Sequence, residues 1–306
     1  MQKFEKWQGC GNDFILIDRP GNAIDEPEKI KWLCDRHFGI GADGVIYIMS
    51  SDKAATRMRI FNADGTEAEM CGNGLRCFAR YLLSGDKFFS DDDLTVETGA
   101  GILTVSMKYD LITVDMGEPI FNADKIPVDG FGSQKLVAEP IEVDGVKYKM
   151  TCVSMGNPHC VVFVDDINRV DLEHIGPKFE THKIFPRKTN TEFVQVIGKD
   201  KLRMRVWERG SGITMACGTG ACATAVAANL NGKAGRKSTV ILDGGELQID
   251  WRENNHIFMT GAAEKVYAGE FSFPENLTAP IDESTSTAET TSATTPSTGS
   301  TFVDGF

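Results

Sequence analysis

The chain has 306 residues, 41% of them hydrophobic and 25% charged, and its formal net charge is −12. This composition is typical of a globular protein large enough for two domains, and the excess of acidic residues argues against nucleic acid or an anionic membrane as a partner. No apolar run approaches the ~20 residues that cross a bilayer, and charged residues stand where the apolar core of a signal peptide would lie. The eight cysteines are too sparse for a secreted disulfide scaffold. Together these features predict a cytoplasmic protein.

The first elements in chain order are a strand, a helix and a second strand. Residues 9–18 predict a polar loop that runs into a strand, because Gly-Asn-Asp is turn chemistry and an apolar run follows it. Residues 28–40 predict a helix followed by a turn, and residues 45–49 predict a strand.

The next segment is part of an internal sequence repeat. Met-Cys-Gly-Asn-Gly at 70–74 recurs as Ala-Cys-Gly-Thr-Gly at 216–220, and the offset of 146 residues from Cys71 to Cys217 also carries 57–61 onto 203–207. In each copy apolar residues alternate with arginine, which predicts a strand, and Cys-Gly-x-Gly then opens a predicted helix. The second helix is small and apolar almost all round, so we expect it to be buried on every side.

Two cysteines at helix starts indicate proton transfer. The partial positive charge of a helix N-terminus favours thiolate, so each thiol could act as a base, and the neighbouring glycine leaves backbone N–H groups open to an anionic ligand. If the two halves face each other, one of Cys71 and Cys217 could remove a proton from a carbon while the other delivers one to the opposite face. That would invert a stereocentre without a cofactor or a metal. Cys77 and Cys222 lie within the predicted helices and are expected to be core.

The remaining segments predict many short strands. In the first half these are residues 94–98, 102–107 and 111–115, followed by an irregular stretch at 123–132, and an echo of 96–99 at 241–244 extends the repeat at an offset of 145. The second half predicts strands at 148–154, 160–164, 192–196, 202–207, 239–242, 247–251 and 257–260. Ser, Thr, Ala, Pro and Gly dominate 284–301, which predicts a disordered low-complexity tail at 281–306.

This pattern predicts an α+β fold of two pseudo-symmetric lobes. Each lobe would be a mostly antiparallel, barrel-like sheet curled around one central helix. A substrate with one reacting and one fixed end should be recognised where the two copies differ. They differ at Asn62 against Glu208 and at the next position, where only the second copy has an arginine, Arg209. Arg209 suits a carboxylate, and Asn62, Asn157 and Asn190 suit a head group that both donates and accepts.

These motifs, with those at 9–18, 61–65, 156–159 and 208–210, closely resemble the diaminopimelate epimerase family over about residues 1–275. The resemblance implies an enzyme that interconverts LL- and meso-diaminopimelate in lysine and peptidoglycan-precursor synthesis, without a cofactor. It implies a fold in which the last strand, about 264–273, crosses back to the first lobe. We accordingly expect an N-terminal lobe of 1–118 plus 264–276, a C-terminal lobe of 119–263 and, by the same analogy, a homodimer.

The resemblance also implies the site residues. Cys71 and Cys217 are the catalytic pair, with Cys217 as the base on one stereoisomer and Cys71 as its acid. His159 and Glu208 help to set the protonation of the thiols, and the sequence does not decide which acts on which. Some family members carry a substrate-binding glutamine where this chain has Gly44. The reacting carboxylate is bound by the backbone N–H groups of Gly72, Asn73, Gly218 and Thr219. The side chains that contact substrate are those of Asn12, Asn62, Asn157, Asn190, Glu208 and Arg209.

Two other functions stay open. A related cofactor-independent racemase would act on a smaller amino acid such as histidine; the distal set around Arg209 argues against it, and the missing glutamine at position 44 keeps it open. In a binding protein or thiol switch, Cys71 and Cys217 would form a regulatory disulfide. In the epimerase the same bond would be an inactivation.

Overall fold

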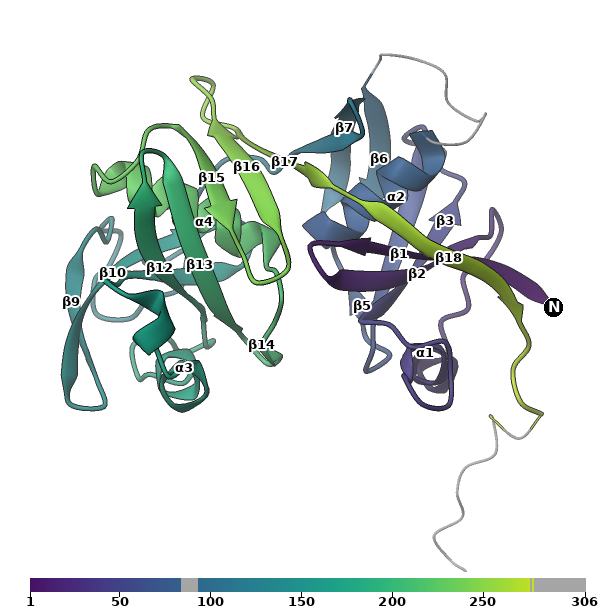
Figure 1. Ribbon diagram of the computed structural model, residues 1–306, viewed down its shortest axis with the longest axis horizontal. Coiled ribbons are helices and arrows are strands. Elements are labelled where there is room, and N and C mark those ends of the chain that lie inside the picture. Colours follow the sequence, from purple (N-terminus) through teal and green to yellow (C-terminus); the bar gives the residue numbers. More distant parts are fainter. Residues whose placement is uncertain (84–92, 276, 278–306) are drawn as a thin grey trace, which may run out of the picture. The chain divides into compact units, whose positions relative to one another are not determined.

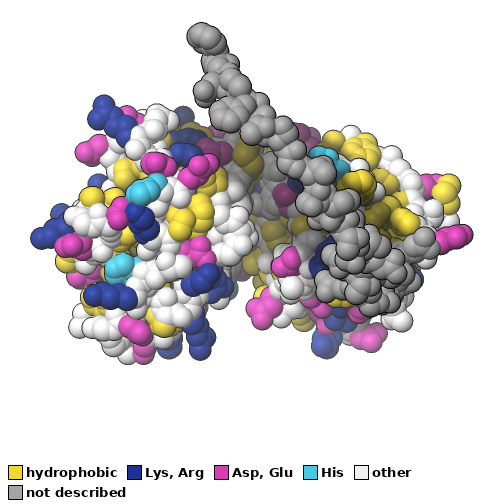
Figure 2. Space-filling model, turned by 90° about the horizontal axis from the view of Figure 1, so that it is seen from below, with side chains coloured by type: hydrophobic (Ala, Val, Ile, Leu, Met, Phe, Trp, Pro, Cys, Tyr) yellow, Lys and Arg dark blue, Asp and Glu magenta, His cyan; other side chains and the backbone are white. Residues whose placement is uncertain are grey.

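The computed structural model describes residues 1–83, 93–275 and 277, and Met1–Phe273 form one compact unit. The tail predicted at 281–306 lies outside the described residues. Strands make up most of the regular structure (Figure 1), and acidic and basic side chains are interspersed on the face shown in Figure 2. Within the described ranges, no helix combines the length and the apolar character needed to cross a bilayer.

Two series of strands follow one another along the chain, each with one long helix (Figure 1). The first comprises β1 (Gln2–Gly9), β2 (Asn12–Asp18), α1 (Pro27–Cys34), β3 (Gly44–Met49), β4 (Thr56–Asn62), β5 (Glu67–Ala68), α2 (Gly72–Leu83), β6 (Leu94–Thr98), β7 (Gly101–Lys108) and β8 (Leu111–Asp115). The second comprises β9 (Glu139–Val143), β10 (Val146–Ser154), β11 (Pro158–Phe163), the 3-10 helix η1 (Ile167–Arg169), α3 (Leu172–Glu180), β12 (Asn190–Gly198), β13 (Lys201–Glu208), β14 (Gly212–Ile213), α4 (Gly218–Leu230), β15 (Lys237–Ile241), β16 (Glu246–Trp251), β17 (Ile257–Ala262) and β18 (Glu264–Phe271).

The two series share one topology. In the first, β2 pairs with β3 and β4 with β6 in parallel, while β3–β4 and β6–β7–β8 are antiparallel. In the second, β11, β12, β13, β15, β16 and β17 repeat these pairings in the same order. β8 pairs with β17, and β18 returns to pair with β1. The predicted α+β fold of two similar halves is confirmed, and the exact lobe boundaries stay predictions.

The register of the parallel pairs corrects the extent of the repeat. Thr56 lies opposite Val96 in the first half, and Leu202 lies opposite Val240 in the second. Val96 and Val240 are therefore equivalent at an offset of 144, so the predicted echo at 145 is wrong by one residue. An odd shift would turn the core side chains outward. The change from 146 to 144 is even, and both valines remain buried.

Both central helices are buried as predicted. In α4 the residues from Gly218 to Ala228 are all buried except Thr219, because small Ala, Cys and Val side chains let strands approach from every side. α2 buries Leu75, Phe78 and Leu82 at helical spacing. Cys77 and Cys222 are fully buried, as expected for core residues.

Sequence patterns missed β1, β9 and α3. α3 begins at the N-cap Asp171, whose side chain accepts a hydrogen bond from the backbone of His174. Gly176 lets the indole of Trp207 pack directly on this helix, since an ideal Cβ there would lie 2.4 Å from the ring. The stretch 123–132 is irregular, as predicted, and is made mostly of turns.

Candidate active site

The two predicted catalytic cysteines stand at the starts of α2 and α4. Cys71 immediately precedes α2, and Cys217 is the N-cap of α4. The backbone N–H of Gly74 donates to Cys71 Sγ over 3.5 Å, and that of Gly220 donates to Cys217 Sγ over 3.4 Å. Each sulfur therefore receives the helix-start donor that the repeat predicts.

The starts of the two helices meet around Met259 of β17. An ideal Cβ on Gly72 would lie 2.8 Å from Met259 Cε, and one on Gly218 would lie 3.1 Å from Met259 Sδ. Asn73 also bridges the two motifs, because its Nδ2 donates to Ala216 O over 3.4 Å. Glycine in both motifs is thus what allows the two cysteine loops to come together.

Burial determines the protonation of both thiols. Burial raises the pKa of Cys71 and raises that of Cys217 well above its usual value, and the nearby Glu208 carboxylate raises both further. The N–H groups of Gly74 and Gly220 act in the opposite direction but are outweighed. Burial therefore opposes the thiolate that a helix start favours at each cysteine, because loss of water costs the anion more than the backbone donors return.

Glu208 is placed to take a proton from Cys217. Its carboxylate accepts a hydrogen bond from the hydroxyl of Thr214, and the neighbouring Cys217 side chain acts to lower its pKa. Burial raises the pKa of Glu208, which brings its proton affinity closer to that of a thiol. The sequence left open which thiol Glu208 acts on, and here its charge raises the pKa of both Cys71 and Cys217.

His159 lies on the same side of the site, in a fully buried pair. Its Nδ1 is 2.7 Å from Glu192 Oε1, and its Nε2 is 3.0 Å from Asn157 Oδ1. Asn157 Nδ2 donates to Thr219 Oγ1 over 3.2 Å, and that oxygen is 3.5 Å from Cys217 Sγ. A chain of hydrogen bonds thus links the imidazole to the Cys217 loop.

Glu192 is a site residue that the sequence analysis missed. It stands on β12, fully buried, beside the strand that carries His159. The repeat holds the one signal that could have found it: 146 residues earlier the chain has the buried Ile46, so an ionisable side chain replaces an apolar one in the second copy.

The predicted recognition residues of the second half lie together. Asn190 Nδ2 donates to Pro158 O over 2.8 Å, and its Oδ1 accepts the backbone N–H of Arg209 over 2.9 Å. The exposed Arg209 guanidinium donates to Arg187 O over 3.1 Å. Within the described ranges no carboxylate pairs with this guanidinium, so it is available to an anionic ligand.

In the first half, Asn12 lies beside the Cys71 loop, and Asn62 lies at the end of β4. Asn12 Oδ1 is 3.7 Å from Cys71 Sγ. Asn62 is exposed at the end of β4 and bonds Thr66 Oγ1 over 3.0 Å. It pairs across the sheet with Gly44, where an ideal Cβ would lie 2.6 Å from Phe61 O. This backbone therefore leaves no room for a side chain at position 44.

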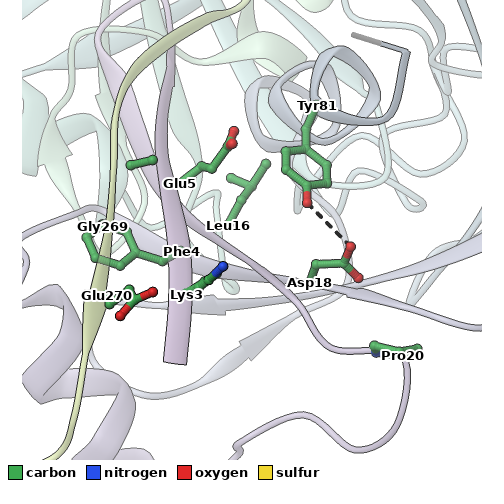
Figure 3. A pocket seen from close by; sticks show the side chains of 10 residues that line it. Lys3, Phe4, Glu5, Leu16, Asp18, Pro20, Tyr81, Gly269 and Glu270 are labelled. Atoms are coloured by element: carbon green, nitrogen blue, oxygen red, sulfur yellow. Dashed lines mark hydrogen bonds between the residues drawn. The ribbon is translucent and has the colours of Figure 1, made fainter. Parts of the chain in front are cut away.

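One sizeable cavity lies away from these residues. A cavity of about 740 Å³ opens between β1, β2 and β18, with Tyr81 of α2 over it, and the Tyr81 hydroxyl is 3.4 Å from Asp18 Oδ2 (Figure 3). It contains none of the predicted site residues. The part of the chain that the structure describes holds no cluster of three or more His, Cys, Asp or Glu side chains arranged to bind a metal.

Comparison with known proteins identifies the family. The family model described as diaminopimelate epimerase matches residues 4–122 and 151–266. The diaminopimelate epimerase of Desulfitobacterium hafniense is 52% identical over 273 residues, which cover 86% of this chain and 96% of that protein. The chloroplastic diaminopimelate epimerase of Oryza sativa subsp. japonica is 50% identical over 282 residues, covering 87% and 79%.

Solved structures show the same fold at much lower identity. A probable proline racemase from Agrobacterium radiobacter has a TM-score of 0.65 at 14% identity, covering 92% of this chain and 95% of its own. A PhzF-family phenazine biosynthesis protein from Bacillus anthracis has a TM-score of 0.64 at 16% identity, covering 89% and 99%. By the extent of the family match and the identity to its named relatives, the chain belongs to the diaminopimelate epimerase family.

Proposed function

We propose that the chain is a cofactor-independent isomerase that interconverts LL-2,6-diaminopimelate and meso-2,6-diaminopimelate, a step in lysine and peptidoglycan-precursor biosynthesis. The observation that carries the proposal is the meeting of the Cys71 and Cys217 loops around Met259, in a chain about half identical to proteins named diaminopimelate epimerase. A homodimer and a cytoplasmic location are parts of the same proposal.

The reaction needs one proton removed and one delivered on opposite faces of the α-carbon. Cys217, after passing its own proton to Glu208, takes the α-proton, and Cys71 donates a proton to the other face. The N–H groups of Gly72, Asn73, Gly218 and Thr219 hold the reacting carboxylate, where negative charge builds up as the α-proton leaves. Enzymes commonly lower barriers by ~8–23 kcal/mol, and here fixed donors, exclusion of water and alignment of the thiols supply this stabilisation.

The far end of the substrate is assigned to Arg209 and the asparagines around it. A guanidinium without a carboxylate partner suits the distal carboxylate, which can bind it through two parallel hydrogen bonds. The Asn190 amide holds the Arg209 backbone, and Asn62, Asn157 and Glu208 complete a polar set for the distal ammonium and carboxylate. This asymmetry between the halves lets the enzyme act on one stereocentre of a symmetric molecule.

The alternatives are a racemase of a smaller amino acid, such as histidine, and a thiol switch. The names of relatives at about half identity favour diaminopimelate over histidine. The Cys71–Cys217 disulfide of the switch is retained only as an inactivated form of the enzyme.

One experiment separates the three functions. LL-diaminopimelate and, separately, L-histidine are incubated in D₂O with wild type, Cys71→Ser and Cys217→Ser, and α-deuterium and stereochemistry are followed. We expect wild type to give deuterated meso product from diaminopimelate alone, and both serine variants to lose inversion. Exchange on histidine alone would contradict the proposal, and exchange on neither substrate would favour the switch.

A further inference from the structure

Two asparagines stand in equivalent places beside the two cysteine loops. Asn12 opens β2, and Asn157 immediately precedes β11, the counterpart of β2 in the second half. Each bonds the polar residue two positions after the cysteine. Asn73 Nδ2 donates to Asn12 Oδ1 over 3.2 Å, whereas Asn157 Nδ2 donates to Thr219 Oγ1 over 3.2 Å. The equivalent amides therefore present opposite ends, a carbonyl to the Cys71 loop and an NH₂ to the Cys217 loop.

Asp43 fixes the orientation of the Asn12 amide. Asp43 Oδ2 accepts Asn12 Nδ2 over 2.7 Å and the backbone N–H of Asp13 over 3.1 Å, and Asp43 Oδ1 accepts Arg36 over 2.9 Å. A carboxylate can only accept, so the nitrogen of Asn12 must face Asp43. Its carbonyl is then directed at Cys71 Sγ, at 3.7 Å.

This orientation has a chemical consequence for Cys71. A carbonyl oxygen accepts a hydrogen bond from S–H but repels a thiolate, and a neutral amide does not take the proton away. The charged groups that act on Cys71 from other elements are Glu208, which also favours the thiol, and Arg76, which opposes it.

Cys217 has the opposite surroundings. Cys217 lies close enough to Glu208 to lower the pKa of that carboxyl, and a carboxylate can accept the thiol proton. Thr219 Oγ1 accepts from Asn157, so its own hydroxyl hydrogen is free to point at Cys217 Sγ, 3.5 Å away, and to stabilise a thiolate once it forms. Burial and Glu192 act against that thiolate, so it forms only when Glu208 has taken the proton.

We propose that Asp43 is a positioning residue: through Asn12 it keeps the proton on Cys71, so that Cys71 enters the reaction as the acid and Cys217 as the base. The inference rests on the two-thiol function proposed above. In one turnover the α-proton passes to the Cys217 thiolate and the Cys71 proton passes to the opposite face of the carbon. The enzyme is left with a Cys71 thiolate, a Cys217 thiol and the proton that Glu208 took from Cys217, and reversal or proton exchange with water restores the starting form.

The test measures the thiols directly and needs no substrate. Iodoacetamide alkylation of Cys71 and of Cys217 is followed at pH 8 by mass spectrometry of their separate peptides, in wild type, Asp43→Ala and Asp43→Asn. Asp43→Ala releases the Asn12 amide, which can then turn its NH₂ to the sulfur, and we expect Cys71 alkylation to rise on the order of tenfold with Cys217 unchanged. Asp43→Asn keeps an oxygen that can accept from Asn12, so it should behave like wild type.

The two substitutions separate orientation from charge, because both remove the charge of Asp43. If Asp43→Asn accelerates Cys71 as much as Asp43→Ala does, charge is the cause and the proposal is overturned. Equal acceleration of both cysteines, or of neither, also overturns it. Arg36→Gln is the control: it removes the ion pairs of Arg36 with Asp43 and Asp13 but leaves the contact of Asp43 with Asn12, and should leave the Cys71 to Cys217 ratio unchanged. In an Asn12→Ala background, Asp43→Ala should have no further effect on Cys71.

The outcome is separable from that of the proposed function. A protein that fails to invert diaminopimelate but labels as described would contradict the function and retain the assignment of the Cys71 proton. A protein that inverts diaminopimelate and labels otherwise would retain the function and lose the role of Asp43.

Discussion

His159 and Glu192 form a fully buried pair, 2.7 Å apart, in which both nitrogens of the imidazole face oxygen atoms. Nε2 faces Asn157 Oδ1 and so must carry a proton, and the contact to Glu192 needs a second one. With two protons the pair has no net charge, so its burial costs less free energy than burial of a single charge. In the first half the equivalent places hold Phe14 and Ile46, both apolar and buried.

Glu192→Gln replaces the carboxyl by an amide, which can still accept a hydrogen bond from His159 but cannot take up a proton or carry the balancing negative charge. We expect the free energy of unfolding to fall by about 1–3 kcal/mol, because a buried charge-assisted hydrogen bond is weakened. We expect kcat/KM to fall by about 10–100-fold, because the position of the Asn157–Thr219 hydrogen-bond chain depends on His159. Denaturant unfolding and steady-state kinetics measure both quantities. The double variant His159→Phe/Glu192→Ile restores the apolar pair of the first half, and should be more stable than either single variant yet remain impaired in catalysis.

Glu180→Gln provides the matched control for that loss. Glu180 is also a buried carboxylate of the second half, and it accepts hydrogen bonds from Trp207 Nε1 over 2.7 Å, Lys188 Nζ over 3.1 Å and the backbone N–H of Gly210 over 3.2 Å, none of which belongs to a cysteine loop. It should lose stability while keeping kcat near wild type. A Glu192→Gln variant with the kinetics of the Glu180→Gln variant would reduce Glu192 to a structural role.

Arg209→Ala tests recognition of the distal carboxylate. Since no carboxylate in the described ranges pairs with this exposed guanidinium, its removal should leave stability within about 0.5 kcal/mol. The loss of a charge-assisted pair with substrate should raise KM by about 10–100-fold. Arg187 is the control, because only its backbone oxygen contacts Arg209. Arg187→Ala should leave KM nearly unchanged, and equal effects of the two substitutions would mean that general positive charge, not Arg209, binds the substrate.

The repeat allowed the catalytic pair to be predicted, because a strand, loop and helix start that recur in one register can be matched without knowing any contact. It also predicted both buried helices from their apolar pattern. The protonation of the thiols could not be predicted in this way. A helix start is visible in the sequence, whereas the burial that outweighs it depends on Met259 and on strands distant in the chain.

Residues that act through another side chain were equally hidden. Glu192 carries no motif and is recognisable only as the place where Ile46 of the first copy became ionisable. In the sequence Asp43 is one polar residue in a predicted loop and carries no functional signal. Its proposed role depends on one carboxylate oxygen that accepts a hydrogen bond from Asn12. α3 was missed because its fit depends on Gly176 meeting Trp207, a contact between segments that local propensity does not describe.

Acid should weaken the protein through Asp13. Burial alone would raise the pKa of this carboxyl, but hydrogen bonds and charge from Arg36 and Lys6 outweigh it and lower the pKa to about 2. Because the unfolded value is about 3.9, the stabilisation is present above that pH and is lost as pH falls towards 2, a difference on the order of 2 kcal/mol. Asp13→Asn should therefore lower the unfolding free energy at pH 7 and have little effect at pH 2. Asp124→Asn, at an exposed position, should have little effect at either pH.

Alkali should weaken the protein through its buried thiols, and here the sign is reversed. Burial raises the pKa of Cys34 and that of Cys222 to about 12 each, whereas an unfolded cysteine has a pKa of about 8.5. Below pH 8.5 both states are protonated and nothing is lost. Above it the unfolded thiols ionise first, so each buried thiol lowers the unfolding free energy by up to about 1.4 kcal/mol per pH unit until its folded pKa is reached.

Unfolding of reduced wild type and Cys222→Ala by denaturant at pH 7, 9 and 10 measures this slope. The alanine variant should differ from wild type by a constant amount near pH 7 and then lose stability less steeply, by the share of one thiol. An identical slope in the two proteins would mean that Cys222 ionises as readily in the fold as outside it, which would contradict its burial in the centre of α4.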